Sequence, residues 1–265
     1  MTRVDQARMT GPAVLGRPAQ TRVGLGLAAL IVVAWLAGHI YGVFLMRWTA
    51  AAWVIAPVLV AIQTWLSVGL FIVAHDAMHG SLAPGSPRLN RGMGRLCVGL
   101  YAGFSYDRLY SAHHRHHAHP GSAEDPDFDA QHPDRFWPWF AKFFRTYFGL
   151  GQFVLIALWT MTEILVLKAR TPSVLTFWAL PALLSAGQLF LFGTWLPHRH
   201  NDQPFIDDAN ARSSDYPWLV SLLTCFHFGY HLEHHSRPDL PWWRLPHARV
   251  GRTEGGLGET LKARP

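Results

Sequence analysis

Histidines in three short groups are the residues of this sequence whose type and spacing best suit chemistry. The groups read HDAMH at 75–79, HHRHH at 113–117 and HLEHH at 231–235. The first has the spacing H-x-x-x-H, and the other two contain H-x-x-H-H. Residues three or four positions apart share one face of a helix, so each group can turn its imidazoles in one direction. Imidazole is the commonest metal ligand in proteins, and the three groups together predict metal binding.

The number of histidines is sufficient for more than one metal ion. The three groups supply eight imidazoles at these spacings, and His198, just after a long apolar stretch, supplies a ninth. A structural zinc takes four protein ligands and a catalytic zinc takes three, so nine nitrogens suffice for two ions. An all-imidazole environment suits iron, zinc, copper or nickel, and ligand type alone leaves that choice open.

The composition places these groups in a membrane protein. Hydrophobic residues make up 50% of the chain and charged residues only 15%, against about 25% charged residues in a typical globular domain. Such a chain has too much apolar surface to be disordered. Cys97 and Cys225 form no C-x-x-C pair, which excludes a disulfide scaffold, and we interpret both as packing residues.

The elements that must position the histidines are membrane helices. Four stretches approach or exceed the length of about 20 residues that a spanning helix needs: Gly24–Met46, Ala51–Ala74, Phe148–Leu167 and Ser173–Leu196. The sequence therefore predicts an all-α integral membrane protein with four transmembrane helices. Arg135–Gly149 interleaves aromatic and basic residues, which predicts a helix in the membrane interface with Trp137 and Trp139 as anchors. The cytoplasmic and interfacial helices would carry a histidine-rich site for two metals.

The distribution of Lys and Arg predicts the orientation. The N-terminal segment, the loop 75–147 and the segment from Pro197 together hold 20 of these residues, whereas the two other connections hold 3. By the positive-inside rule, both termini and the metal site face the cytoplasm, in the inner membrane. We expect a catalytic domain at 24–247 between cytoplasmic tails at 1–23 and 248–265. Topology explains the net charge of +6, so no nucleic acid is expected as a partner.

Two ionisable residues lie inside the predicted spans. His39 lies 15 residues after Gly24, and Glu163 lies 15 residues after Phe148. Both spans run outward from the cytoplasm, so the two side chains reach a similar depth. Because ionisable groups in lipid generally pair with one another, we predict a contact between His39 and Glu163.

The three histidine groups resemble those of the membrane fatty-acid desaturase and hydroxylase superfamily, di-iron enzymes that activate oxygen and have four spanning helices. Within it, FIVAHDAMHG, HHRHHAHPGSAEDPDF, TWLPHRH and FHFGYHLEHHSRPDLPWWRLP are similar to the bacterial β-carotene ketolase family, and the resemblance covers Phe71 to about Pro246. It implies two iron ions, O₂ as co-substrate, and a carotenoid substrate in the lipid bilayer. The implied reaction converts the C4 methylene of the β-ionone rings to a ketone through two hydroxylations. Acceptance of zeaxanthin stays open.

The resemblance also implies which residues hold the iron. Carried over by position, the ligands are His75, His79, His113, His116, His117, His198, His231, His234 and His235. His227 stands where related desaturases often have an asparagine. Whether it is a tenth ligand, a water-mediated ligand or a hydrogen-bonding neighbour is left open. His114 matches no ligand position, and no separate catalytic acid or base is assigned.

Two carboxylates are our first candidates to support the ligands. Metal-bound imidazoles usually donate their second N–H to a carboxylate or carbonyl, and Asp125 and Asp127 lie close to the second histidine group. The alternative interpretation is a solvated acidic turn after Pro120-Gly121.

Reduction of O₂ requires electrons that this chain has no means to collect. It lacks a dinucleotide or flavin fingerprint, which implies an external donor, ferredoxin-like or another small reductase. The motifs do not encode the depth of the substrate pocket, so a carotenoid ring hydroxylase and an acyl-lipid desaturase remain alternatives. A metal transporter is a more distant one, because its ligands should lie near the bilayer midplane.

Overall fold

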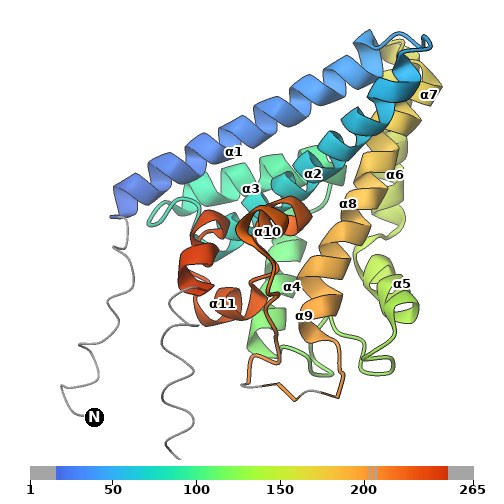
Figure 1. Ribbon diagram of the computed structural model, residues 1–265. Coiled ribbons are helices and arrows are strands. Elements are labelled where there is room, and N and C mark those ends of the chain that lie inside the picture. Colours follow the sequence, from blue (N-terminus) through green and yellow to red (C-terminus); the bar gives the residue numbers. More distant parts are fainter. Residues whose placement is uncertain (1–15, 203, 206–207, 250–265) are drawn as a thin grey trace, which may run out of the picture.

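The computed structural model describes residues 16–202, 204–205 and 208–249. Every regular element within these residues is a helix, which confirms the predicted all-α class (Figure 1). Most of the two predicted tails, at 1–15 and 250–265, lies outside the described residues.

Three continuous helices are long and apolar enough to cross a membrane, and to within one residue at each end they cover the first, second and fourth predicted spans. They are α1 (Arg17–Ile40) continued by the π-helical η1 (Tyr41–Leu45); α2 (Ala52–His79); and the series α7 (Thr171–Val174), η3 (Leu175–Ala179), α8 (Leu180–Phe190), η4 (Leu191–Trp195) and α9 (Leu196–His198). The first begins at Arg17 rather than Gly24, so part of the predicted N-terminal tail is helical.

The third predicted span is one arm of a bent pair of helices. α5 (Phe136–Tyr147) is followed by α6 (Leu150–Met161) and the π-helical η2 (Thr162–Val166), and the two arms meet at 76°. α5 corresponds to the segment predicted to lie in the interface. The fold thus has three spanning candidates, or four if the bent pair counts as one, which agrees with the prediction.

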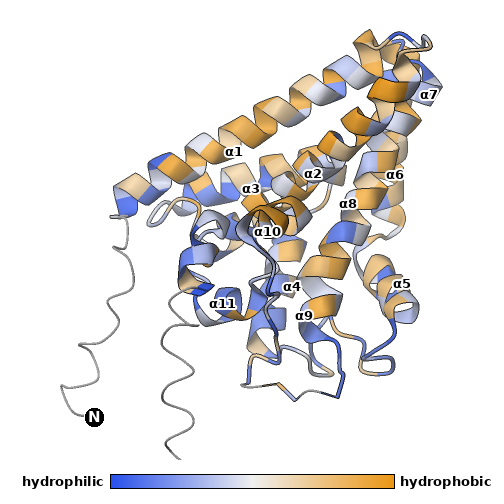
Figure 2. Ribbon diagram, viewed as in Figure 1, coloured by the Kyte–Doolittle hydropathy of each residue, from blue (hydrophilic) through white to orange (hydrophobic). Residues whose placement is uncertain are grey.

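The shorter helices gather at one end of the long ones. They are α3 (Pro87–Ala102), α4 (Tyr106–Ala118), α10 (Trp218–Cys225), α11 (His231–Ser236) and the 3₁₀ turn η5 (Trp242–Arg244). Figure 2 shows hydrophobic residues along α1, α2, α8 and α10, whereas hydrophilic residues concentrate on α11, on the lower part of α4 and in the adjoining loops. The polar end of the bundle therefore carries the histidine groups.

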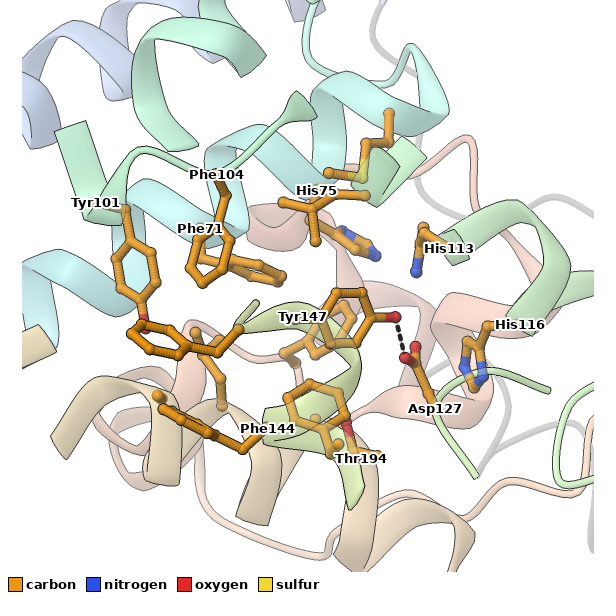
Figure 3. A pocket seen from close by; sticks show the side chains of 18 of the residues that line it. Phe71, His75, Tyr101, Phe104, His113, His116, Asp127, Phe144, Tyr147 and Thr194 are labelled. Carbon is orange, nitrogen blue, oxygen red and sulfur yellow. Dashed lines mark hydrogen bonds between the residues drawn. The ribbon is translucent and has the colours of Figure 1, made fainter. Parts of the chain in front are cut away.

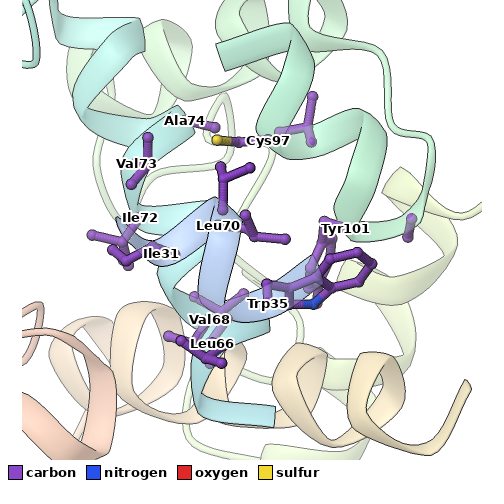
Figure 4. Packing of buried hydrophobic residues seen from close by; sticks show 14 of the residues in the cluster. Ile31, Trp35, Leu66, Val68, Leu70, Ile72, Val73, Ala74, Cys97 and Tyr101 are labelled. Carbon is purple, nitrogen blue, oxygen red and sulfur yellow. The ribbon is translucent and has the colours of Figure 1, made fainter. Parts of the chain in front are cut away.

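The apolar core lies where α1, α2 and α3 meet (Figure 4). Ile31 and Trp35 of α1 and Leu70 of α2 belong to this cluster, together with Cys97 and Tyr101 of α3. The Trp35 indole donates a 3.0 Å hydrogen bond to the Ser67 hydroxyl. Both cysteines are buried and free, as expected of packing residues.

The predicted contact between His39 and Glu163 is confirmed. His39 Nε2 lies 2.8 Å from Glu163 Oε1, and the two residues are only 4% and 1% exposed. The His39 ring also stacks on Trp35, with centroids 5.0 Å apart. The pair connects the end of α1 to η2. At this level both helices change from α-helical to π-helical geometry.

The two tryptophans of the interfacial helix α5 differ in their exposure. Trp137 is 74% exposed, as expected of an anchor, but Trp139 is fully buried, so the prediction is wrong for Trp139. Its indole packs on Phe128 and Phe190 and donates a 2.7 Å hydrogen bond to the carbonyl of Asp127. Neighbours two positions apart on a helix point in different directions, so one faces outward while the other fills the core.

Candidate metal centre

Four helices bring the predicted histidines to one place. α2 ends with His75 and His79, α4 and α11 each carry three, and α9 ends at His198. Local backbone features set these positions. Gly80, with φ of 72°, ends α2 directly after His79, and Phe226 and His227 take φ of 49° and 63° in the turn from α10 to α11. Such left-handed residues reverse the chain abruptly, which allows short helices to point at one centre.

The nine histidines form two groups whose possible ligand atoms all lie within 4.8 Å of one another. The first group comprises His75, His79, His113, His117 and His234, and the second comprises His116, His198, His231 and His235. The structure therefore brings together all nine histidines that the spacing and the resemblance single out, and it divides them between two sites.

Each H-x-x-H-H group contributes to both sites, although its spacing could have turned all three imidazoles in one direction. In α4, His113 and His117 belong to the first site and His116 to the second; in α11 this division is reversed. The reason is helical geometry. Positions i and i+4 point nearly the same way, whereas i+3 and i+4 are adjacent residues that diverge by about 100° around the axis.

The imidazole nitrogens face one another. Nε2 of His79 lies 2.7 Å from Nε2 of His113, and Nε2 of His117 lies 2.9 Å from that of His234. In the second group, Nε2 of His235 lies 3.2 Å from that of His116 and 3.1 Å from that of His231. Two imidazoles bound at right angles to a metal, with bonds of about 2.1 Å, have nitrogens about 3 Å apart. The nitrogen–nitrogen distances within each group therefore fit a metal ion bound between the imidazoles of that group.

Unpartnered nitrogens support the same fit. His198 Nδ1 donates a 2.7 Å hydrogen bond to the carbonyl of Asn210, which leaves the Nε2 lone pair buried and without a hydrogen-bond partner in the described residues. Both nitrogens of His75 are buried without such a partner, although Nδ1 lies 3.6 Å from Asp76 Oδ1. Buried polar atoms left unpaired destabilise a fold, and a metal ion would satisfy one nitrogen of each of these two rings.

Burial keeps these imidazoles in the form that binds metals. Burial and the neighbouring imidazoles together lower the pKa of His117 to about 2, and they lower the pKa of His113, His231 and His234 well below the usual range. Only the neutral ring has a lone pair to offer a cation. His116 is different: burial opposes its charge, but the hydrogen bond to Asp125 and nearby carboxylates raise its pKa.

Asp125 contacts a histidine of the second group, as expected of a carboxylate that orients a metal ligand. Its Oδ2 is 2.9 Å from His116 Nδ1 and accepts a 2.9 Å hydrogen bond from Gly121 N, and the residue is 2% exposed. It is therefore not a solvated turn residue. The bond leaves Nε2 of His116 facing the second group, which is the arrangement found around metal-bound imidazoles. Asp127 accepts a hydrogen bond from the Tyr147 hydroxyl instead.

Two further histidines lie outside both groups. His227, 1% exposed, is surrounded by Tyr230 and two tryptophans, with its ring 5.9 Å from that of Tyr230, and burial lowers its pKa to about 4. The structure does not bring it to either site. His114 is exposed on α4, where its Nδ1 lies 2.9 Å from the Tyr110 carbonyl.

A cavity opens beside the two sites (Figure 3). His75 and His113 of the first group and His116 and His231 of the second line one part of it, and most other lining residues, among them Tyr101, are aromatic or aliphatic. Such a cavity can hold an apolar molecule with one part against the histidines.

Sequence reasoning missed two residues of this site. Asn210 orients His198 through its backbone carbonyl, which no side-chain pattern could signal. Tyr147 ends the interfacial helix and reaches the cavity with its hydroxyl. Its position at the end of an amphipathic helix, next to a bend, was the available signal.

Comparisons with known proteins agree with this architecture. The model of the family described as fatty acid desaturase matches residues 48–174 and 153–255. The chain is 48% identical to a β-carotene ketolase of Paracoccus sp. (strain PC1), over 88% of this chain and 95% of that protein. It is 49% identical to the β-carotene ketolase of Paracoccus sp. (strain N81106 / MBIC 01143), over 87% and 93%. A zeaxanthin 4-ketolase of Chlamydomonas reinhardtii is 37% identical, over 89% of this chain and 55% of that protein.

Proposed function

This chain belongs to the fatty acid desaturase family, and from that premise we propose that it is a β-carotene ketolase, which oxidises the C4 methylene of the end rings to a ketone. The observation that carries the proposal is the apolar cavity lined by histidines of both groups. A hydrocarbon substrate needs an apolar cavity to bind in, and its oxidation needs the metal-binding histidines at the edge of that cavity. The similarity to ketolases over most of the chain supplies the substrate class.

The nine histidines would hold two iron ions, one in each group. Bound iron would supply the activation of O₂ and the removal of hydrogen from C4, whose C–H bonds are weakened by the adjacent double bond. The protein's own part is to hold the imidazoles together, to orient two of them through Asp125 and the Asn210 carbonyl, and to keep water away from the reacting carbon.

The overall chemistry balances with an external reductant. Each hydroxylation consumes one O₂, two electrons and two protons; it places one oxygen atom on C4 and releases the other as water. A second hydroxylation of the same carbon gives a geminal diol, which loses water to leave the ketone. Because the chain lacks a nucleotide fingerprint, a ferredoxin-like protein or another small reductase would deliver the electrons.

We further propose that the protein is integral to the inner membrane, with both termini and the metal groups on the cytoplasmic side. The Lys and Arg distribution supports this orientation. Residues 24–247 would form the catalytic domain, between tails at 1–23 and 248–265. The carotenoid would enter from the bilayer past α5, whose aromatic residues Phe143, Phe144 and Tyr147 line the cavity.

Expression in cells that make β-carotene tests the function. The chain should convert the pigment to the mono- and diketone, echinenone and canthaxanthin, identified by chromatography and mass. A chain carrying His234→Ala is the matched control and should leave β-carotene unchanged. Hydroxylated carotenoids without ketones would indicate a ring hydroxylase instead. Unchanged β-carotene together with new double bonds in membrane lipids would indicate an acyl-lipid desaturase. A second culture that makes zeaxanthin would show whether 3-hydroxylated rings are accepted.

A further inference from the structure

A polar pair lies in the cavity outside both histidine groups. The Tyr147 hydroxyl donates a hydrogen bond to Asp127 Oδ1, and both side chains line the cavity (Figure 3). The wall on the far side of Tyr147 from the histidines includes the rings of Phe71, Phe104 and Phe144. A few polar groups on an apolar wall usually fix the orientation of a ligand that has a polar group of its own.

The pair is fixed in place by α5. The Asp127 carbonyl accepts a 2.7 Å hydrogen bond from the buried indole of Trp139, and the Asp127 amide donates a 2.8 Å bond to Asp125 Oδ1. Lys142 binds the next carbonyl, that of Phe128. Because three residues of one helix hold both members of the pair, little conformational freedom is left to lose when a ligand binds.

The pair lies directly beside the metal groups. Possible ligand atoms of Asp127, Asp125 and His116 lie within 4.8 Å of one another. In Figure 3 the Asp127 carboxylate lies between Tyr147 and His116, on the same side of the cavity as His113. A hydroxyl on a ring carbon that faces the histidines would therefore be within reach of the pair.

We propose that Tyr147 and Asp127 bind the hydroxyl that the first oxidation places on C4. The pair would draw that hydroxyl to one side, so that the remaining C–H bond of the same carbon points at the metal groups. This inference rests on the proposed function, because it requires an enzyme that oxidises one carbon twice. The pair would thus determine whether a ring leaves as an alcohol or as a ketone.

The hydrogen-bonding capacity of the pair fits this role. The Tyr147 oxygen, which donates to Asp127, can still accept a hydrogen bond, and Asp127 Oδ2 has no hydrogen-bond partner in the part of the chain that the structure describes. A substrate hydroxyl can donate to either atom. Unmodified β-carotene has no such group, so the pair should affect the second oxidation far more than the first.

The test compares two substrates of the purified enzyme, supplied with its reductant. Tyr147→Phe keeps the ring that lines the cavity and removes only the hydroxyl. We expect turnover of 4-hydroxylated β-carotene to fall roughly 10-fold, the value of one hydrogen bond in a charged network. Turnover of β-carotene to the 4-hydroxylated product should fall much less, so that this alcohol accumulates. Asp127→Asn should shift the product ratio in the same direction.

Controls separate this role from a structural one. Tyr110→Phe removes an exposed tyrosine hydroxyl from α4 and should leave the product ratio of the wild type. Equal loss of turnover with both substrates in Tyr147→Phe would show that the pair only supports the fold, and would overturn the inference. With zeaxanthin as a third substrate, a loss of turnover confined to zeaxanthin would also overturn the inference, because the pair would then bind a 3-hydroxyl. If the wild type makes no ketone from either substrate, the proposed function itself fails.

Discussion

Buried histidines occur in two regions of this molecule and are stabilised in opposite ways. Inside the apolar bundle, His39 Nε2 faces a carboxylate oxygen of Glu163 at 2.8 Å. At the polar end, Nε2 of His79 faces Nε2 of His113 at 2.7 Å, and other imidazoles meet in the same way. Nε2 of His39 already has a carboxylate partner, whereas at the polar end Nε2 atoms of several imidazoles converge and suit a shared cation. His116 shows that a carboxylate on Nδ1 is compatible with this, because its Nε2 still faces another imidazole of the second group. In this molecule a buried histidine therefore indicates a metal site where its Nε2 faces other imidazoles.

The two regions are far enough apart to be tested separately. The Gln63 amide of α2 donates to the carbonyl of Trp35, one turn before His39. From Gln63, α2 runs on to His75 at 1.5 Å per residue, which separates the two regions by roughly 20 Å. Substitutions at sites that far apart should act independently.

The largest effect is expected at the histidine groups. His234→Ala removes a buried imidazole that faces His117 at 2.9 Å and leaves the first group one ligand short. We expect ketone formation in cells to fall at least about 100-fold, since even residues that only support a metal ligand cost 10- to 100-fold. Pigment analysis measures the loss, with the amount of membrane-inserted protein as the control. Activity near the wild-type level would remove His234 from the metal centre.

The next effect concerns stability rather than activity. Glu163→Leu leaves His39 Nε2 buried without its partner and should lower the free energy of unfolding by about 1–3 kcal/mol. The thermal unfolding midpoint of the protein in detergent measures this change. The double variant His39→Leu/Glu163→Leu should recover part of the loss, because exchange of both partners for apolar groups is nearly neutral. Loss of metal from Glu163→Leu would contradict the independence of the two regions.

Much of this contrast was predictable because it rests on spacing. The lengths of the apolar stretches predicted the spans, and equal depth in two of them predicted the contact of His39 with Glu163. The step from an interfacial helix to a span at Phe148 also followed from the sequence, but the inward turn of Trp139 was not predictable. It depends on which side of an aromatic-rich helix finds a core to fill, and that is decided by distant residues.

A smaller effect is expected at Asp125, the carboxylate that contacts His116. Asp125→Asn keeps an oxygen that can accept from His116 Nδ1 but removes the negative charge. We expect retention of iron to weaken by roughly 10-fold, the lower end of the range for residues that orient a metal ligand. Titration with a competing chelator measures it, and Asp129→Asn, in the same loop, is the matched control. Equal iron retention in both variants would mean that Asp125 does not support His116.

The smallest effect is expected at a histidine of the same helix that points away. His114 lies between two predicted ligands in sequence, but its ring is exposed and stacks on Tyr110 with centroids 4.1 Å apart. His114→Ala should change ketone formation by less than about 2-fold, in line with most surface substitutions. A loss as large as that of His234→Ala would show that a histidine contributes to the site through its place in the sequence cluster, even where its side chain points away from the metal groups.

The composition of the candidate site was predictable, but its division was not. Family resemblance and spacing singled out the nine histidines, and the structure gathers all nine. Their assignment to two groups depends on how α4 and α11 are rotated about their axes, and no motif states that rotation. His227 shows the same limit, since its place in sequence suggests a ligand while its ring packs against Tyr230.

The iron content of the purified wild-type protein tests the central claim most directly. Elemental analysis of protein prepared with sufficient iron should give about two iron atoms per chain, because the nine histidines lie in two separate groups, and no other metal in comparable amount. Removal of the iron with a chelator should abolish ketone formation, and its return should restore it. Fewer than about one iron per chain, or ketone formation by the iron-free protein, would contradict the account.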